Sequence, residues 1–145
     1  MASVKDILDR KGAQVVTVTP ETTVLEAARL MNRHKIGGLV VVDEKGGVAG
    51  VFTERDILQR VIAEDRSPRE VPVSQVMTAK VACCKLNTTL EECQSVMTSQ
   101  RIRHLPVVED GRLLGIVTSG DILAMEREVQ QTTIEYLHDF LHGRR

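Results

Sequence analysis

The sequence predicts an α/β protein of the α+β type, in which two β-α-β-β-α units pack with pseudo-twofold symmetry and a long C-terminal helix follows. Three observations predict this fold. The chain contains an internal repeat, each copy alternates apolar runs of strand and helix type, and the last helical pattern outruns its counterpart. A length of 145 residues is enough for two small units that share a core.

The repeat emerges when the chain is shifted on itself by 66 residues, which aligns Thr22-Thr23-Val24 with Thr88-Thr89-Leu90. When Lys45 is skipped, Asp56-Ile57-Leu58 aligns with Asp121-Ile122-Leu123. From Thr22 to Leu58, 14 of 36 aligned pairs are identical, where chance would give about two at ordinary residue frequencies. The chain therefore contains a duplication.

Each copy has the same order of predicted elements. An extended run precedes a Thr-Thr pair suited to capping a helix, and apolar residues then recur at helical spacing. Two apolar runs separated by an acidic, Gly-containing spacer form a hairpin, and a second helix begins at Thr53 or Thr118. The extended runs are 15–18 and 81–84, and the hairpins pair 39–42 with 48–52 and 105–108 with 113–117.

These patterns divide the chain into a first unit (1–66), a linker (67–72), a second unit (73–128) and a helical extension (129–145). The connection from 64 to 72 carries charges and two prolines, so we expect it to be exposed. The last helix is predicted to run from Asp121 to about His142. Its apolar stripe has no core left to cover, which predicts a homodimer; the stripe comprises Met125, Val129, Tyr136 and Phe140, with Ile134, Leu137 and Leu141 beside it.

Composition excludes several classes of protein. The net charge is −1 with acids and bases interspersed, which argues against nucleic acid as a partner. There is no apolar run of membrane-spanning length and no signal-peptide pattern, and three cysteines do not form a disulfide framework. We therefore expect a cytoplasmic protein without a membrane partner. Aromatic residues make up only 2% of the chain, so a flat ligand would be held by aliphatic side chains.

A Gly-x-x-Thr-x-x-Asp turn occurs in both copies, at Gly50–Asp56 and Gly115–Asp121. The Thr begins a helix, where its hydroxyl and the neighbouring N–H groups suit an anion. The Asp lies one turn later and can accept hydrogen bonds from both hydroxyls of a ribose. A single such turn could equally be only a helix cap. Because both copies keep all three residues, the pattern favours ligand binding.

Three segments carry a resemblance to a known family: Val73-Ser-Gln-Val-Met-Thr78, Ile102-Arg-His-Leu-Pro-Val-Val108 and Gly115-Ile-Val-Thr-Ser-Gly-Asp121. They resemble cystathionine-β-synthase (CBS) domains, and the first copy matches more loosely at 35–42 and closely at 50–56. Two tandem CBS domains form a Bateman module, which here covers nearly the whole chain. The resemblance implies a regulatory module like stand-alone bacterial CBS-domain proteins, with one cleft per domain for AMP, ATP, NAD, NADH or a related adenosine ligand.

The resemblance also implies the residues of each cleft. The Asp121 cleft would use Thr118, Asp121, Arg103 and His104 with Thr17, Val18 and Ile36. The Asp56 cleft would use Thr53, Arg55 and Asp56 with Cys83 and Ile102, and has Gly37-Gly38 where the other has Arg103-His104. Glycines allow close approach but bring no charge. This difference ranks the Asp121 cleft first for a phosphate-bearing ligand.

There is no G-x-x-x-x-G-K-S/T loop, no G-x-G-x-x-G after a strand, no C-x-x-C and no H-E-x-x-H motif. No nucleophile has an evident base, so we expect neither catalytic residues nor an enzyme. We also expect no metal, because His138 and His142 lack a third ligand. The sequence predicts a nucleotide sensor that signals energy or redox state through an unknown effector protein or its own assembly. The alternative is a structural module with vestigial clefts, and an enzyme acting on its nucleotide is the third and least favoured hypothesis.

Overall fold

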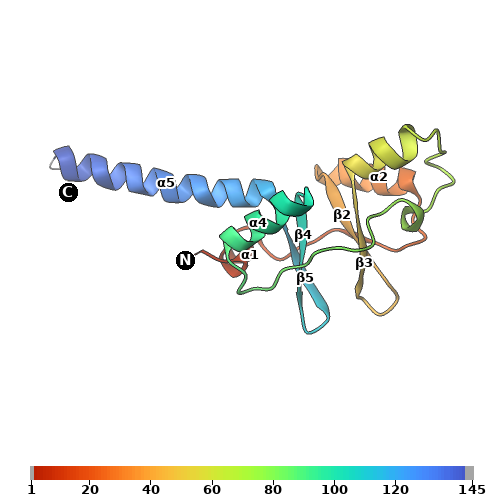
Figure 1. Ribbon diagram of the computed structural model, residues 1–145, viewed down its shortest axis with the longest axis horizontal. Helices are drawn as coiled ribbons and strands as arrows, with labels where there is room; N and C mark the ends of the chain where they lie inside the picture. Colours follow the sequence, from red (N-terminus) through yellow and green to blue (C-terminus); the bar gives the residue numbers. More distant parts are fainter. Residues whose placement is uncertain (1, 143–145) are drawn as a thin grey trace.

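A computed structural model describes residues 2–142, except for the side chains of 129, 130, 132, 133 and 142, and it contains two similar halves side by side (Figure 1). The chain begins with helix α1 (Val4–Lys11). The first half contains β1 (Thr17–Val18), α2 (Val24–His34), β2 (Gly38–Val42), β3 (Val48–Thr53) and α3 (Glu54–Asp56), which continues into the π-helical turn η1 (Ile57–Ile62). The second half contains η2 (Val73–Gln75), α4 (Leu90–Gln100), β4 (His104–Glu109), β5 (Arg112–Thr118) and α5 (Ser119–His142).

Both helices that were predicted to follow a Thr-Thr pair form, and each is capped as expected. The Thr23 hydroxyl accepts a hydrogen bond from the Glu26 N–H at 3.2 Å, and the Thr89 hydroxyl accepts one from the Glu92 N–H at 3.1 Å. These bonds satisfy backbone donors that the first helical turn cannot pair internally. The duplicated threonines therefore fix where α2 and α4 begin.

The two sheets confirm the predicted hairpins but differ in their first strand. In the first half β1 runs parallel to β2, and β2 is antiparallel to β3. In the second half β4 pairs with β5, and the predicted strand at 81–84 is reduced to one bridge between Cys84 and Val107. The cause is Pro106, which takes the place of Val40. The Val40 N–H donates to the Val16 carbonyl, whereas proline has no N–H to donate.

The two halves exchange the segments that lead into them: the segment before the first half packs in the second core, and the segment before the second half packs in the first core. Val4 and Ile7 of α1 are buried in the second core, and Val71 and Val73 are buried in the first. Matching backbone bonds seat the two segments. The Val4 N–H donates to the Thr88 carbonyl at 2.9 Å, and the Val73 N–H donates to the Thr22 carbonyl at 2.8 Å. The α1 helix was not foreseen from the sequence.

The expectation that 64–72 is exposed is wrong for Val71, which is 7% exposed. Its carbonyl accepts a hydrogen bond from the Val24 N–H at 2.9 Å, and the Pro68 carbonyl accepts one from Leu25. The first turn of α2 has N–H donors without a partner inside the helix, and carbonyl groups of the 64–72 connection accept their hydrogen bonds. The prolines and charges correctly indicate a segment without regular secondary structure, but this segment is hydrogen-bonded to α2 and partly buried.

Helix α5 leaves the second half and extends well beyond it (Figure 1). Met125 packs against the second core, whereas Ile134, Leu137 and Leu141 are 60%, 51% and 74% exposed. Val129, also part of the predicted stripe, lies outside the described side chains. None of the helices between residues 2 and 142 combines the length and apolar character needed to cross a bilayer.

Gly50 offers a test of how the segment that passes from the first half to the second (residues 76–84, the crossing segment) is held against β3. A Cβ at this position would lie 2.7 Å from both the Met77 Sδ and the Thr78 carbonyl oxygen. Gly50→Ala should therefore push Thr78 away from β3 and lower the free energy of unfolding by about 1–3 kcal/mol. Urea denaturation measures this change, and Gly120→Ala is the control because its Cβ would meet nothing closer than 3.6 Å. Equal stability of the two variants would contradict the close approach.

Candidate functional site

The Gly-x-x-Thr-x-x-Asp turn of the first half brings Thr53 and Asp56 together at the junction of β3 and α3. The Thr53 N–H donates to Asp56 Oδ2 at 3.0 Å, and the Thr53 hydroxyl donates to the same oxygen at 3.3 Å. The helix start therefore orients the carboxylate through its own backbone. The turn therefore holds Oδ2, and Thr53 makes no bond to Oδ1.

Asp56 is a buried acid, with 5% of its surface exposed. Burial raises the pKa of its carboxyl, and this effect outweighs the opposing hydrogen bonds from Thr53 and Thr78 and the charge of Arg60. Arg60 Nε lies 3.7 Å from Asp56 Oδ1, which is beyond hydrogen-bond length. Arg60 also donates to the Val76 and Met77 carbonyls. Its guanidinium group therefore ties the crossing segment to the helix that carries Asp56.

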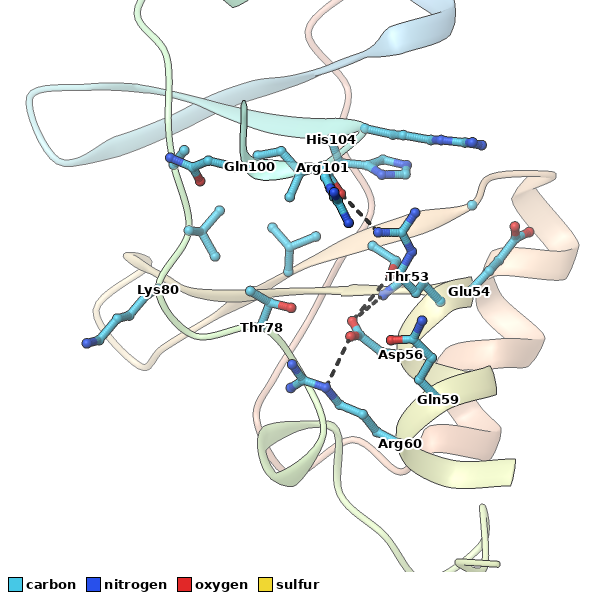
Figure 2. Close-up of a pocket in the computed structure, with 17 residues that line it drawn as sticks. Thr53, Glu54, Asp56, Gln59, Arg60, Thr78, Lys80, Gln100, Arg101 and His104 are labelled. Carbon is cyan, nitrogen blue, oxygen red and sulfur yellow. Dashed lines mark hydrogen bonds and ion pairs between the residues drawn. The ribbon is translucent and has the colours of Figure 1, made fainter. Parts of the chain in front are cut away.

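A cavity of about 450 Å³ opens in front of Asp56, and residues from both halves form it. Figure 2 shows Thr53, Asp56 and Arg60 on one wall, with Gln100, Arg101 and His104 across from them. Thr78 and Lys80 belong to the crossing segment at its side. The remaining lining residues are Gly37, Val51, Glu54, Arg55, Gln59, Val81, Ala82, Ile102 and Arg103.

The cavity lining is strongly cationic. Five basic side chains line it against two acidic ones; the basic residues are Arg55, Arg60, Lys80, Arg101 and Arg103. Arg55 donates to the Arg101 carbonyl at 3.0 Å and so bridges α3 to the end of α4. The apolar part of the cavity lining is aliphatic and comes from Val51, Val81, Ala82 and Ile102. Such a surface suits an anionic ligand with a flat apolar part.

His104 stands between the turns of the two halves. Its ring would lie 3.0 Å from a Cβ on Gly38, the residue that is equivalent to it in the repeat. Burial lowers the pKa of the imidazole, and the charges of Arg103 and Lys11 act in the same direction, whereas Glu54 and Asp121 oppose them. The groups that act on this ring therefore belong to both halves, and Gly38 gives the ring its space.

The Asp121 turn repeats the geometry of the first, with one addition. The Thr118 N–H donates to Asp121 Oδ2 at 2.9 Å, and the Asp121 N–H donates to the Thr118 hydroxyl at 3.2 Å. The ammonium group of Lys11, at the end of α1, lies 2.7 Å from the same Oδ2. Asp121 is thus already hydrogen-bonded to a cation from outside the turn.

The predicted site residues separate into groups. Those that line the cavity at Asp56 are Thr53, Arg55, Asp56, Ile102, Arg103 and His104. The resemblance assigns Arg103 and His104 to the Asp121 cleft, and both line the cavity at Asp56. His104 also pairs with Thr118 across β4 and β5, so it adjoins both turns. Ile36 lines a neighbouring hollow, while Thr17, Val18 and Cys83 line neither.

Several cavity residues were missed from the sequence. Arg60 lies one helical turn after Asp56, so its position was readable from spacing alone. Thr78, Lys80 and Lys11 were not readable in this way, since they reach the turns only through the exchange of segments between the halves. No local pattern in the sequence signals that exchange.

Comparison with known proteins identifies the repeated unit. A sequence profile described as the CBS domain matches residues 4–63 and 73–128. The chain is 41% identical over 122 residues to the CBS domain-containing protein YhcV of Bacillus subtilis, covering 84% of each chain. The crystal structure of the CBS-domain protein ATU1752 from Agrobacterium tumefaciens superposes with a TM-score of 0.82 at 44% identity, over 86% of this chain and 99% of that one. A CBS pair therefore accounts for nearly all of these relatives.

Two more distant structures bear on ligands. Hypoxic Response Protein I, with two coordinated zinc ions, matches with a TM-score of 0.73 at 29% identity, over 86% of this chain and 99% of its own. Within the described side chains of this protein, no three His, Cys, Asp or Glu residues gather into such a site.

The other structure is the CBS domain pair of MJ0100, in complex with 5′-methylthioadenosine and S-adenosyl-L-methionine, with a TM-score of 0.78 at 29% identity, over 88% of this chain and 98% of its own. A CBS pair of this fold thus binds adenosine derivatives. With both of its halves matched in sequence and the pair matched in structure, this chain belongs to the CBS domain family.

Proposed function

We propose that the protein is a regulatory CBS pair that binds an anionic adenosine ligand, of the AMP, ATP or NAD type, in the cavity at Asp56 and does not transform it. The observation that carries the proposal is the combination of one buried carboxylate and five basic side chains around a single cavity. The adenosyl ligands of the MJ0100 pair support the adenosine part of this ligand, and the basic side chains support its anionic part.

Asp56 suits the ribose of such a ligand. Its Oδ2 is held by Thr53, Arg60 Nε lies 3.7 Å from Oδ1, and Thr78 adds a further hydrogen bond to the carboxylate. A sugar hydroxyl that donates to Oδ1 would take the place of Thr78. A hydrogen bond to a charged acceptor contributes about 1.5–3 kcal/mol. The base would lie among aliphatic side chains, since no Phe, Tyr or Trp belongs to the described lining of the cavity.

The basic side chains suit the phosphate. Arg55 and Arg103 reach the cavity from opposite halves, so a phosphate bound between them would draw the halves together. The same charges oppose a cationic ligand such as S-adenosylmethionine. We therefore propose the Asp56 cavity, in place of the Asp121 cleft that the sequence ranked first, as the main site for a phosphate-bearing ligand.

The proposed role is regulatory because the lining lacks the parts of a catalytic site. No Ser or Cys is among the described residues of the cavity, and its acids are Glu54 and the turn-bound Asp56. The output would pass to an effector protein, or through assembly of the chain. Vestigial clefts in a structural module are the competing hypothesis, and ligand titration separates the two.

The ligand is tested by thermal unfolding with AMP, ATP, NAD, NADH, adenosine and S-adenosylmethionine. A ligand present at 100 times its Kd should stabilise the fold by about 2.7 kcal/mol. Asp56→Asn should weaken AMP binding about tenfold to hundredfold, whereas the matched Asp121→Asn should weaken it less. If no ligand raises the unfolding temperature at millimolar concentration, the clefts are vestigial. Chromatography of the incubated ligands detects any product, which would contradict the absence of chemistry.

The charge preference is tested with Arg55→Met. Losing one exposed cation should weaken AMP binding by about fivefold relative to adenosine binding, the equivalent of about 1 kcal/mol. Calorimetric titration of both ligands gives this ratio, which is insensitive to the bridge from Arg55 to Arg101 because that bridge affects both ligands. Arg112→Met, on the exposed start of β5, should leave the ratio unchanged. A constant ratio in Arg55→Met would rule out a phosphate contact.

We further propose a homodimer through the apolar stripe of α5. Ile134, Leu137 and Leu141 are spaced three and four residues apart and are all more than half exposed, as in helices that pair along a seam. Leu137→Asp should convert a dimer into a monomer in sedimentation velocity experiments, whereas Glu135→Gln on the same helix should not. A monomeric wild-type protein, or a dimer that survives Leu137→Asp, would contradict this interface.

A further inference from the structure

The Asp121 turn differs from the Asp56 turn in what its carboxylate already binds. At Asp56 the nearest cation is Arg60, whose Nε lies 3.7 Å from Oδ1. At Asp121 the Lys11 ammonium is hydrogen-bonded at 2.7 Å, and the two side chains are only 30% and 22% exposed. An ion pair that is shielded to this degree is screened less by solvent than a surface pair.

The cation has changed position between the two halves. Arg60 is one helical turn after Asp56, and the equivalent residue after Asp121 is Met125. Met125 has no charge, and the cation near Asp121 is instead Lys11 of α1. Helix α1 is anchored in the second core by Val4, Ile7 and Leu8. Arg10, next to Lys11, contacts Met125 and Glu128 on α5. The last turn of α1 is therefore fixed over the start of α5, with Lys11 pointing to Asp121.

The hydrogen bonds at Asp121 leave little capacity on one oxygen. Oδ2 accepts from both the Thr118 N–H and the Lys11 ammonium, and a carboxylate oxygen has about two lone-pair sites. A ribose that donates one hydroxyl to each oxygen would need the site occupied by Lys11. At Asp56 the second bond to Oδ2 comes from the Thr53 hydroxyl at 3.3 Å, which can rotate away, whereas at Asp121 it comes from the 2.7 Å ion pair. The turn cannot give up the Thr118 bond without unwinding the helix start, so Lys11 is the partner that must leave.

We propose that Lys11 is an intramolecular competitor at the Asp121 cleft, so that an adenosine ligand enters this cleft only by displacing the Lys11 ammonium from the carboxylate. The proposal rests on the proposed function, because it assumes that the Asp of each turn receives a ribose. It assigns the two clefts different thresholds: the Asp56 cavity fills first, and the Asp121 cleft fills at higher ligand concentration. Displacement would also remove one of the contacts between α1 and α5, while those of Arg10 remain.

The test measures adenosine binding in an Asp56→Asn background, where the Asp121 cleft remains. Adenosine is used because it has no phosphate that Lys11 could attract. Adding Lys11→Met should tighten adenosine binding about tenfold, because the competing charged hydrogen bond is lost. Lys11→Arg keeps the cation and should bind as weakly as the parent. Lys5→Met is the matched control on the same helix, since Lys5 pairs with Asp9 at the exposed surface. Thermal unfolding verifies that each variant is folded.

The outcomes separate this inference from the proposed function. Unchanged or weaker adenosine binding in Lys11→Met would overturn the competition. The same holds if the wild type binds adenosine and neither the Asp56→Asn parent nor its Lys11→Met derivative does, although the proposed function would then survive. If the wild type binds none of the adenosine ligands, the proposed function fails and the competition fails with it.

Discussion

The exchange of leading segments between the halves determines most of what the structure can do. The Val4 N–H is bound by the second half and the Val73 N–H by the first, so each core is closed by a segment that the chain must carry across. The crossing segments pass the two Thr-x-x-Asp turns on their way. The cavity at Asp56 is therefore made of three parts of the chain at once, and none of them can move without disturbing a hydrophobic core.

Local features were predictable from the sequence, and features that depend on the crossing were not. The Thr23 and Thr89 caps and both hairpins follow from residues within one or two turns of each other. The reduced strand at Cys84 could have been predicted from Pro106, whose missing N–H was visible. Helix α1 had a local signal that was missed, because Ser3 and Asp6 form a capping pair ahead of Val4, Ile7 and Leu8. The burial of Val71 and the contact between Lys11 and Asp121 required tertiary information, since each joins residues more than 40 positions apart.

The same division applies to the candidate site. The Thr and Asp of both turns lie where the repeat predicts, with the same backbone hydrogen bond in each half. The charges around them do not follow the repeat. Arg55 is replaced by Gly120 and Arg60 by Met125, whereas Lys11 supplies a cation from a helix outside the aligned region. Duplication thus preserved the backbone of two sites, while single substitutions gave them different electrostatics.

The contact between Gly38 and His104 has a consequence for why the two halves are joined in one chain. The ring of His104 occupies space that a side chain at position 38 would need, and the two positions are equivalent in the repeat. In a dimer of identical single units, the same residue would stand at both positions. Two histidines would collide there, and two glycines would leave a gap. A covalently linked pair is free of that restriction, because its two equivalent positions can differ and one imidazole can use the space beside a glycine.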